Sequence, residues 1–191
     1  MKIITTFLIF LYLINFEITL SQEISTNNCF NSAGIKASNI SGYGIYYNRK
    51  LSDNLNIQFN GLIYYYQNKS NNIEQKIFNY DIGFEIQRNV FIGNNYRYYL
   101  LAGAFYYRDD DKKDGNDNLI QIINHSFNIG IGFVGEYQYN RLIFSFDIGY
   151  KYFEDNLETT INNNLSFPEL KRVTKIGAGI GAGFIFWNKT N

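Results

Sequence analysis

Apolar and polar residues alternate along most of the chain. From Leu142 to Tyr152, every second residue is apolar, and Ser145, Asp147 and Lys151 fall between them. The segment from Phe127 to Phe133 repeats the pattern with asparagine and glycine at the polar positions. Because successive side chains of a strand point to opposite faces, a period of two predicts strands with one apolar and one polar face. No segment shows the 3.6-residue period of an amphipathic helix.

Eight segments carry this alternation. They span residues 32–39, 42–49, 55–67, 76–89, 96–108, 119–137, 142–153 and 172–187. The connections near 50–54, 90–95 and 138–141 are short, whereas 68–75, 109–118 and 154–171 are longer and polar. Tight turns at one end and longer loops at the other are typical of membrane barrels. The sequence therefore predicts an all-β fold, an eight-stranded antiparallel up-and-down transmembrane β-barrel formed by residues 22–191 as one domain.

Alternation alone does not tell which face of the barrel points inward. An eight-stranded barrel is just wide enough for side chains to fill it, and the glycine-rich polar face fits that space better than the aromatic face. Aromatic residues also gather near predicted strand ends, as girdles of a membrane barrel do. These are Tyr64 to Tyr66, Tyr106 with Tyr107, and Tyr150 to Phe153. We therefore expect the apolar face to contact lipid; the alternative is a soluble secreted barrel that binds a small apolar ligand inside.

The polar face carries charges of both signs, which a barrel interior tolerates only if they pair. These charged residues are Lys36, Asp81, Glu85, Glu136, Asp147 and Lys151. The last strand, within "KIGAGIGAGFIFW" (Lys175 to Trp187), has glycine at every second residue from Gly177 to Gly183, so these glycines all lie on that face. Glycine inside a strand marks the close approach of another group. We expect these glycines to leave room for long side chains such as Lys151 or Glu85.

The first residues are typical of an export signal. Lys2 precedes an apolar stretch from Ile3 to Phe16, and small residues up to Ser21 form a cleavage site. The apolar stretch is too short to span a bilayer, although a retained anchor is the alternative. We expect residues 1–21 to be a cleaved signal peptide. Cys29 is the only cysteine, so no internal disulfide can form, and we expect a free thiol.

Candidate catalytic and metal-binding groups are few. The formal net charge is zero, so the chain lacks the basic patch of a nucleic-acid-binding protein. His125 is the only histidine; Ser126 points to the opposite face and Glu136 has opposite parity, so these residues form no catalytic triad. We expect an interfacial histidine, and no catalytic, cofactor-binding or metal-binding residue.

The acidic run "DDDKKDGNDN" (Asp109 to Asn118) resembles a calcium loop only superficially. Lys112 stands at a position that would need an oxygen ligand. The position at which a calcium loop ends with an acidic residue is occupied by Gln121. We expect a solvated loop tip here.

Two segments resemble a known family. "GIKASNISG" (Gly34 to Gly42) and "LSDNLNIQFNGLIYYYQNK" (Leu51 to Lys69) are similar to the opening strands of the small outer-membrane β-barrel domain of Bacteroidota-type bacteria, described as porin-like or PorT-like. The first outer loop, around Ile40 and Ser41, is almost absent here. The resemblance implies an outer-membrane location in a Gram-negative bacterium and no shared catalytic site.

The expected function is that of a non-enzymatic outer-membrane barrel with a structural or surface-interaction role through its outer loops. Its expected surroundings are outer-membrane lipid and lipopolysaccharide, with an unknown surface ligand or envelope protein as partner and no nucleic acid. We expect a monomer. A component of a secretion or gliding machine is a second possibility that the resemblance allows.

Overall fold

The computed structural model describes residues 30–70, 73–115, 118–162, 164–165 and 168–188, and all the regular structure in them is β-strand. The strands are β1 (Phe30–Ser38), β2 (Gly42–Ser52), β3 (Leu55–Ser70), β4 (Ile73–Ile92), β5 (Tyr96–Gly115), β6 (Asn118–Tyr139), β7 (Leu142–Ile161), β8 (Asn164–Leu165) and β9 (Glu169–Asn188). The expected signal peptide, residues 1–21, and Cys29 lie outside the described residues. No helix in the described part of the chain is long and apolar enough to cross a membrane.

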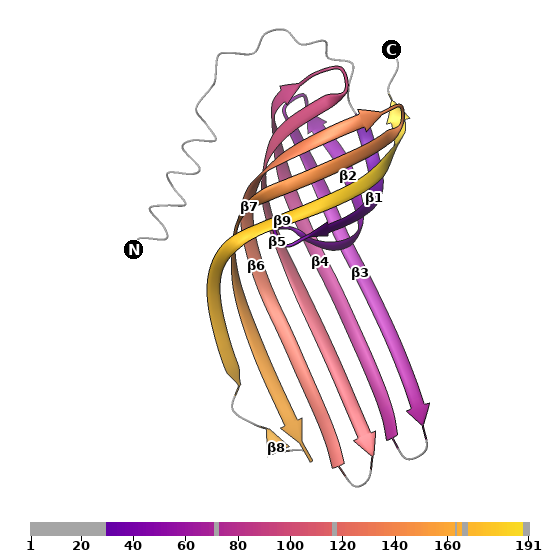
Figure 1. The fold of residues 1–191 in the computed structure, drawn as a ribbon, viewed down its shortest axis with the longest axis vertical. Coiled ribbons are helices and arrows are strands. Elements are labelled where there is room, and N and C mark those ends of the chain that lie inside the picture. Colours follow the sequence, from indigo (N-terminus) through magenta and orange to yellow (C-terminus); the bar gives the residue numbers. More distant parts are fainter. Residues whose placement is uncertain (1–29, 71–72, 116–117, 163, 166–167, 189–191) are drawn as a thin grey trace.

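The strands form one closed antiparallel sheet (Figure 1). Each strand from β1 to β7 pairs with the next in sequence, β7 pairs with β9, and β9 pairs with β1. The two-residue strand β8 only extends the end of β7. The prediction of an eight-stranded up-and-down barrel is therefore confirmed.

Six strands continue well beyond the closed barrel. The β1–β2 hairpin ends early, whereas β3, β4, β5, β6, β7 and β9 run on as an open sheet, seen in the lower half of Figure 1. We call this part, formed by the described residues of 62–81, 107–126 and 153–177, the extension. The prediction of long outer loops at 68–75, 109–118 and 154–171 is wrong for most of these residues. In the extension both faces are in solvent, so side chains need not alternate while the backbone ladder continues.

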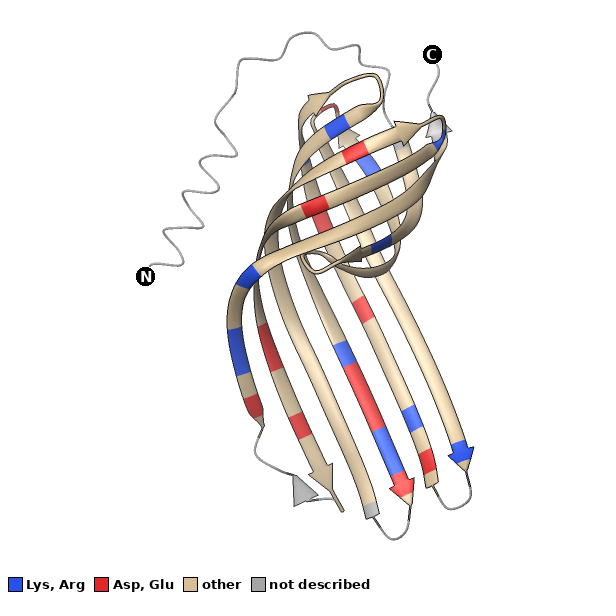
Figure 2. Cartoon of the chain, in the orientation of Figure 1, with Lys and Arg blue, Asp and Glu red and all other residues tan. Residues whose placement is uncertain are grey.

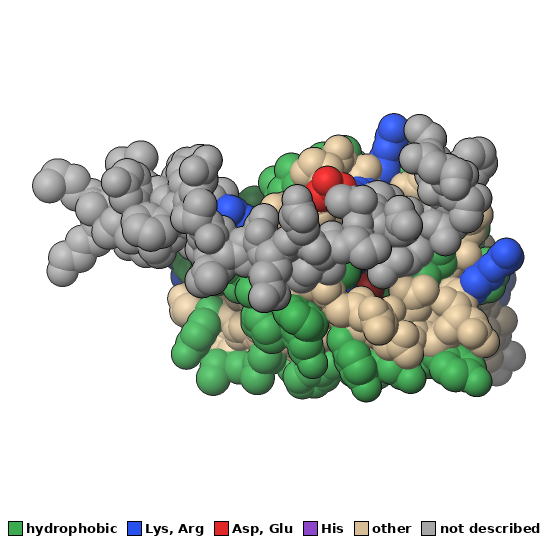
Figure 3. Space-filling model, turned by 90° about the horizontal axis from the view of Figure 1, so that it is seen from above, with side chains coloured by type: hydrophobic (Ala, Val, Ile, Leu, Met, Phe, Trp, Pro, Cys, Tyr) green, Lys and Arg blue, Asp and Glu red, His purple; other side chains and the backbone are tan. Residues whose placement is uncertain are grey.

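Within the barrel, the apolar face points outward. The side chains of Phe84, Ile131 and Phe144 are 44%, 43% and 49% exposed, whereas those of Glu85 and Asp147 are fully buried at 0%. Figure 3, which looks along the barrel, shows hydrophobic side chains projecting from the outside of the molecule. The predicted orientation of the faces is confirmed, and the alternative of an apolar ligand held inside an apolar interior is wrong.

Aromatic rings contact one another at two levels of this outer face. Near the turn end, Tyr96 packs on Tyr137 with ring centroids 5.0 Å apart, and Tyr98 stacks on Phe133 at 5.9 Å. At the boundary with the extension, Tyr80 packs on Tyr106 at 5.9 Å. Tyr106 therefore belongs to a group of packed aromatic rings on the outer face, although its strand continues beyond it, and its place in a membrane girdle stays a prediction. Tyr64 to Tyr66 lie in the extension, beyond this level.

The turn between β1 and β2 folds into the barrel interior. Ile40 and Ser41 are fully buried at 0%, and Ile40 forms an apolar cluster with Tyr99, Leu101 and Val134. Gly42 follows the turn with φ of +104°, a conformation that glycine adopts without strain. The short connection noticed in the sequence thus fills the lumen, and we call residues 39–41 the plug turn.

The plug turn explains most of the interior glycines. A methyl group at Gly177 would lie 2.8 Å from Ile40 Cγ1, and one at Gly130 would lie 2.5 Å from Ile40 Cγ2. At Gly179 it would lie 2.5 Å from Ser38 Cβ, at the start of the turn. The expectation that these glycines make room for Lys151 or Glu85 is wrong. They make room for the backbone and side chains of the first hairpin.

Candidate functional site

The barrel interior is built around one lysine and two carboxylates from three separate strands. Lys36 of β1 forms an ion pair with Glu85 of β4, and its Nζ lies 3.6 Å from Asp147 Oδ2 on β7. Ser38 Oγ donates a hydrogen bond of 2.8 Å to Asp147 Oδ1. The side chain of Lys36 is only 2% exposed. The predicted pairing of interior charges is confirmed for these three residues.

Carboxamide side chains extend this network. Gln58 and Gln87 each donate to Glu85 at 3.1 Å. Asn60 Nδ2 donates a bond of 2.8 Å to the carbonyl oxygen of Ser41 and so holds the plug turn in place. The alternation of the strands already places these amides on the same face as Glu85, but uncharged polar residues on that face give no sign of which groups they bind. Charge, cross-strand amides and plug turn together fill the cross-section of the barrel.

A second ion pair lies closer to the short turns. Arg97 of β5 donates to Glu136 of β6 at 2.7 Å, and its guanidinium lies 4.2 Å from the centroid of the Tyr99 ring. Glu136 was expected to pair, and it does. Arg97 was missed because it stands among three tyrosines, where the aromatic residues dominate the pattern.

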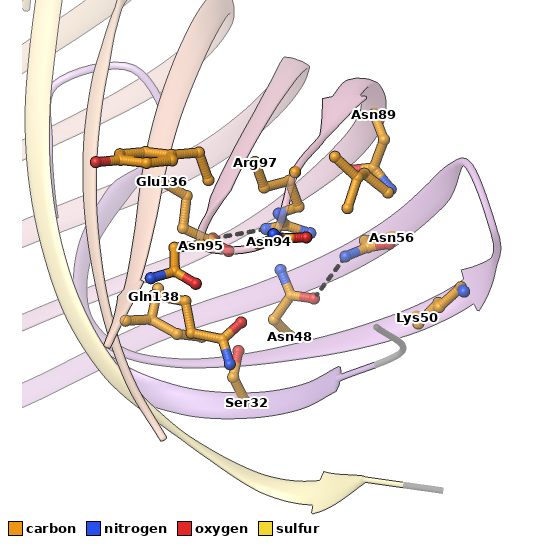
Figure 4. Close-up of a pocket in the computed structure, with 14 residues that line it drawn as sticks. Ser32, Asn48, Lys50, Asn56, Asn89, Asn94, Asn95, Arg97, Glu136 and Gln138 are labelled. Carbon is orange, nitrogen blue, oxygen red and sulfur yellow. Dashed lines mark hydrogen bonds and ion pairs between the residues drawn. The ribbon is translucent and has the colours of Figure 1, made fainter. Parts of the chain in front are cut away.

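A small pocket opens at this end of the barrel (Figure 4). Its polar lining consists mainly of amides and one ion pair: Ser32, Asn48, Lys50, Asn56, Asn89, Asn94, Asn95, Arg97, Glu136 and Gln138. Two of the cations are neutralised, because Arg97 pairs with Glu136 and Lys50 pairs with Asp53 at 2.7 Å. The pocket is a polar vestibule whose cations each have an acidic partner, and Asn48 joins its lining to the interior network by a hydrogen bond of 2.8 Å to Gln87.

Two of the predicted interior charges have no ion pair among the described residues. Asp81 Oδ2 accepts a bond of 3.3 Å from the backbone N–H of Tyr43, while its other carboxylate oxygen has no hydrogen-bond partner. Lys151 donates to Asn128 Oδ1 at 3.3 Å and lies 4.8 Å from the centroid of the Phe153 ring. For Asp81 and Lys151, the predicted pairing is therefore wrong. Both residues lie near the boundary between the barrel and the extension.

The structure keeps the candidate catalytic residues apart. His125 lies on the outer face, where its ring stacks on Tyr106 at 6.4 Å and its Nε2 lies 3.1 Å from Asn156 Nδ2. Ser126 points inward and is 7% exposed. The predicted separation of His125 from Ser126 and Glu136 is confirmed. Among the described residues, no group of three or more histidine, cysteine and acidic side chains could hold a metal ion.

The acidic run from Asp109 belongs to a strand. Residues 109–115 pair with β4 on one side and β6 on the other, so the expected loop tip is wrong for them. Gln75 donates to Asp111 at 3.1 Å, and Gln121 donates to Asp110 at 2.8 Å. Burial raises the pKa of Asp109, with Asp111 and Asp110 adding to the rise and a hydrogen bond from Tyr107 opposing it. Figure 2 shows charges of both signs along β4, β5 and β9 of the extension and acidic residues along β7.

The fold is similar to several solved barrels. The chain is 10% identical to CarO of Acinetobacter baumannii, with 85% of this chain and 100% of that chain covered and a TM-score of 0.47. It is 11% identical to the outer-membrane protease OmpT of Escherichia coli, covering 87% and 99%, with a TM-score of 0.49. It is 13% identical to the attachment invasion locus protein Ail of Yersinia pestis, covering 82% and 97%, with a TM-score of 0.43. No protein-family model matches the sequence, and no curated protein matches it.

Proposed function

We propose that this protein is an exported, integral outer-membrane barrel of a Gram-negative bacterium. The observation that carries the proposal is the division of its faces, with apolar side chains outside and a hydrogen-bonded ionic network inside. A closed sheet is one of two structures that can satisfy every backbone polar group in a bilayer. An exposed belt of Phe, Ile and Tyr on a protein in water would instead be a large aggregation-prone patch.

Cell fractionation tests this location. The protein should appear in the detergent-extracted outer membrane and should migrate faster on a gel before boiling than after, because a closed barrel resists unfolding by detergent. Recovery from the soluble periplasm without detergent, or migration that does not change on boiling, would contradict a membrane barrel.

The orientation follows from the uneven ends of the barrel. Membrane barrels place short turns on the periplasmic side and longer elements outside. The turns at residues 53–54, 93–95 and 140–141 therefore face the periplasm, and the extension faces the surroundings. A cysteine at Asp114, near the tip of β5, should react with a membrane-impermeant maleimide on intact cells, whereas one at Asn94 should react only after lysis. The reverse labelling pattern would overturn this orientation.

The role we propose is non-enzymatic, structural or interactive, and carried by the extension. The plug turn and the Lys36 network fill the lumen, which supports a sealed barrel rather than a solute pore. The extension presents both faces of a six-stranded sheet to the surroundings, above a belt set in lipid and lipopolysaccharide. A variant that lacks the outer half of the extension should still migrate faster on a gel before boiling than after. It should no longer bind the surface ligand or envelope protein that the extension contacts.

A component of a secretion or gliding machine is the second candidate that the resemblance to PorT-like barrels favours. Affinity purification from detergent extracts distinguishes the two. Co-purification of envelope proteins in fixed ratio would support the machine, and purification of this chain without other proteins would support the independent barrel.

A further inference from the structure

The extension has two unpaired edges. Strand β3 pairs with β2 only as far as Gly61, so Leu62 to Ser70 pair with no strand on that side among the described residues. Strand β9 pairs with β1 from Gly179 onward, so Glu169 to Gly177 are likewise unpaired on that side. Each edge is nine residues long, and both begin at the level where the β1–β2 hairpin ends.

Free edges of this length recruit other strands. An edge strand presents a row of unpaired N–H and C=O groups, and proteins usually shield it with proline, bulges or charges. Every side chain from Leu62 to Ser70 is exposed, and Lys69 near the tip is the only charged residue among them. Strand β3 therefore offers an unshielded edge that includes Tyr64, Tyr65 and Tyr66.

The two edges are complementary in direction. Strand β3 runs from the barrel toward the tip of the extension, and β9 runs from the tip back to the barrel. When two copies stand in the same membrane with their gaps facing, a two-fold axis along the membrane normal sets β3 of each copy beside β9 of the other. The strands in both contacts are antiparallel, and both contacts form at once, as in a closed isologous dimer.

We propose that the protein forms a two-fold symmetric dimer in which β3 of each copy pairs with β9 of the other. This inference rests on the proposed membrane location, because the membrane gives both copies the same orientation. Pairing joins the two extensions into one ring of strands, six from each copy, without a free edge. Closure removes the edges completely, which shielding by side chains does only in part.

The register supports this pairing. Aligning the two edges at the barrel rim sets Leu62 opposite Gly177, and the remaining pairs then follow from the antiparallel arrangement. They are Ile63 with Ile176, Tyr64 with Lys175, Tyr65 with Thr174, Tyr66 with Val173, Gln67 with Arg172, Asn68 with Lys171, Lys69 with Leu170 and Ser70 with Glu169. Residues facing the inside of one extension meet residues facing the inside of the other, and no pair joins like charges. If β3 were displaced by two residues along β9, Lys69 would lie opposite Arg172 instead of Leu170. Two like charges directly opposite each other are unfavourable.

A monomer is adequate for the barrel itself, whose strands are all paired, and this is why the sequence predicts one. The extension supplies the reason for a second copy. An unrelated extended polypeptide could occupy one edge, but the matched lengths, levels and directions of the two edges are those of a self-complementary contact.

Cysteine cross-linking in native membranes tests the dimer. In a Cys29→Ser background, the double variant Tyr66→Cys/Val173→Cys places two thiols opposite each other across the proposed contact. Within one chain these positions lie on opposite edges of the six-stranded extension, so a disulfide between them joins two copies. Oxidation with copper phenanthroline should convert most of the protein to a covalent dimer that reducing agent dissolves.

The matched control is Tyr66→Cys/Thr174→Cys, in which the second thiol lies on the other face of β9. It should cross-link at least tenfold less at the same oxidant concentration. Native mass spectrometry of the wild-type protein in detergent should show two chains. The dimer would be overturned if the protein keeps its heat-modifiable migration but stays a single chain and forms no cross-link. It would also be overturned if a single chain binds an added extended peptide that protects its edge. Loss of heat-modifiable migration in the wild type would contradict the membrane barrel instead.

Discussion

Individual residues of the outer belt tolerate apolar substitution but not charge. Ile131→Arg or Phe144→Arg should lower the free energy of unfolding by roughly 2 to 4 kcal/mol, because a cation at mid-bilayer must be desolvated. Asp114→Arg, at the exposed tip of β5, should change it little. Urea titration in lipid vesicles with tryptophan fluorescence measures both, and equal losses at belt and tip would contradict the outward orientation of the belt.

Interior glycine is a second feature that single substitutions can test. Gly130→Ala adds a methyl group 2.5 Å from Ile40 Cγ2 and 2.9 Å from the Ile40 carbonyl oxygen, and overpacking of this kind costs about 1 to 3 kcal/mol. Gly61→Ala is the matched control, because its new methyl would meet nothing closer than 3.7 Å. The temperature at which gel migration changes should fall for Gly130→Ala alone. An equal decrease in both variants would show that the plug turn does not constrain Gly130.

Lys36 tests the network that joins three strands. Lys36→Met leaves Glu85 and Asp147 buried without their cation, and breaking a buried pair in this way costs about 3 to 5 kcal/mol. The triple variant Lys36→Met/Glu85→Gln/Asp147→Asn should recover much of the loss, because it removes the uncompensated charges. Unfolding in guanidinium chloride compares the three proteins. A triple variant no more stable than Lys36→Met would show that packing, not charge, sets the cost.

Among the strands, β5 gives the clearest distinction between extension and loops. Residues 109–115 are held on both sides by β4 and β6, so their amides should exchange slowly with deuterium. Solvated loop amides would exchange within seconds. Mass spectrometry of labelled peptides from the protein in detergent measures this, and rapid exchange across the segment would favour the loop that the sequence suggested.

The alternation of apolar and polar residues predicted some parts of the strands and missed others. Alternation located all eight barrel strands, because in those segments one face meets lipid and the other meets the interior. It lost the outer halves of β5 and β7, because consecutive charged residues, such as those from Arg108 to Asp114, interrupt the alternation while the backbone pairing continues. The glycines of β9 showed that another group comes close, but a three-residue connection gives no sign that Ile40 would be that group.

For the molecule as a whole, we expect a barrel that conducts no ions. The plug turn, the Lys36 network and the Arg97–Glu136 pair occupy successive levels of the lumen. Purified protein in planar bilayers should therefore show no resolvable conductance steps. The conductance of the Ile40→Gly variant should be compared with that of the wild type, because this substitution empties part of the apolar cluster and leaves the ionic network in place. Steady conductance from the wild-type protein would contradict a sealed interior.

The contact of β1 with β9 joins residues 30–38 to residues 179–188, nearly the two ends of the described chain. The same first hairpin supplies Lys36, the cation that lies beside Glu85 and Asp147, and the turn after its first strand supplies the buried side chain of Ile40. Before that seam forms, β1 and β9 are both unpaired edges, and Asp147 of β7 is separated from Lys36 in the strand order. We therefore expect closure of the sheet and pairing of Asp147 with Lys36 to occur together, because an open sheet leaves edge strands whose backbone groups a bilayer cannot satisfy.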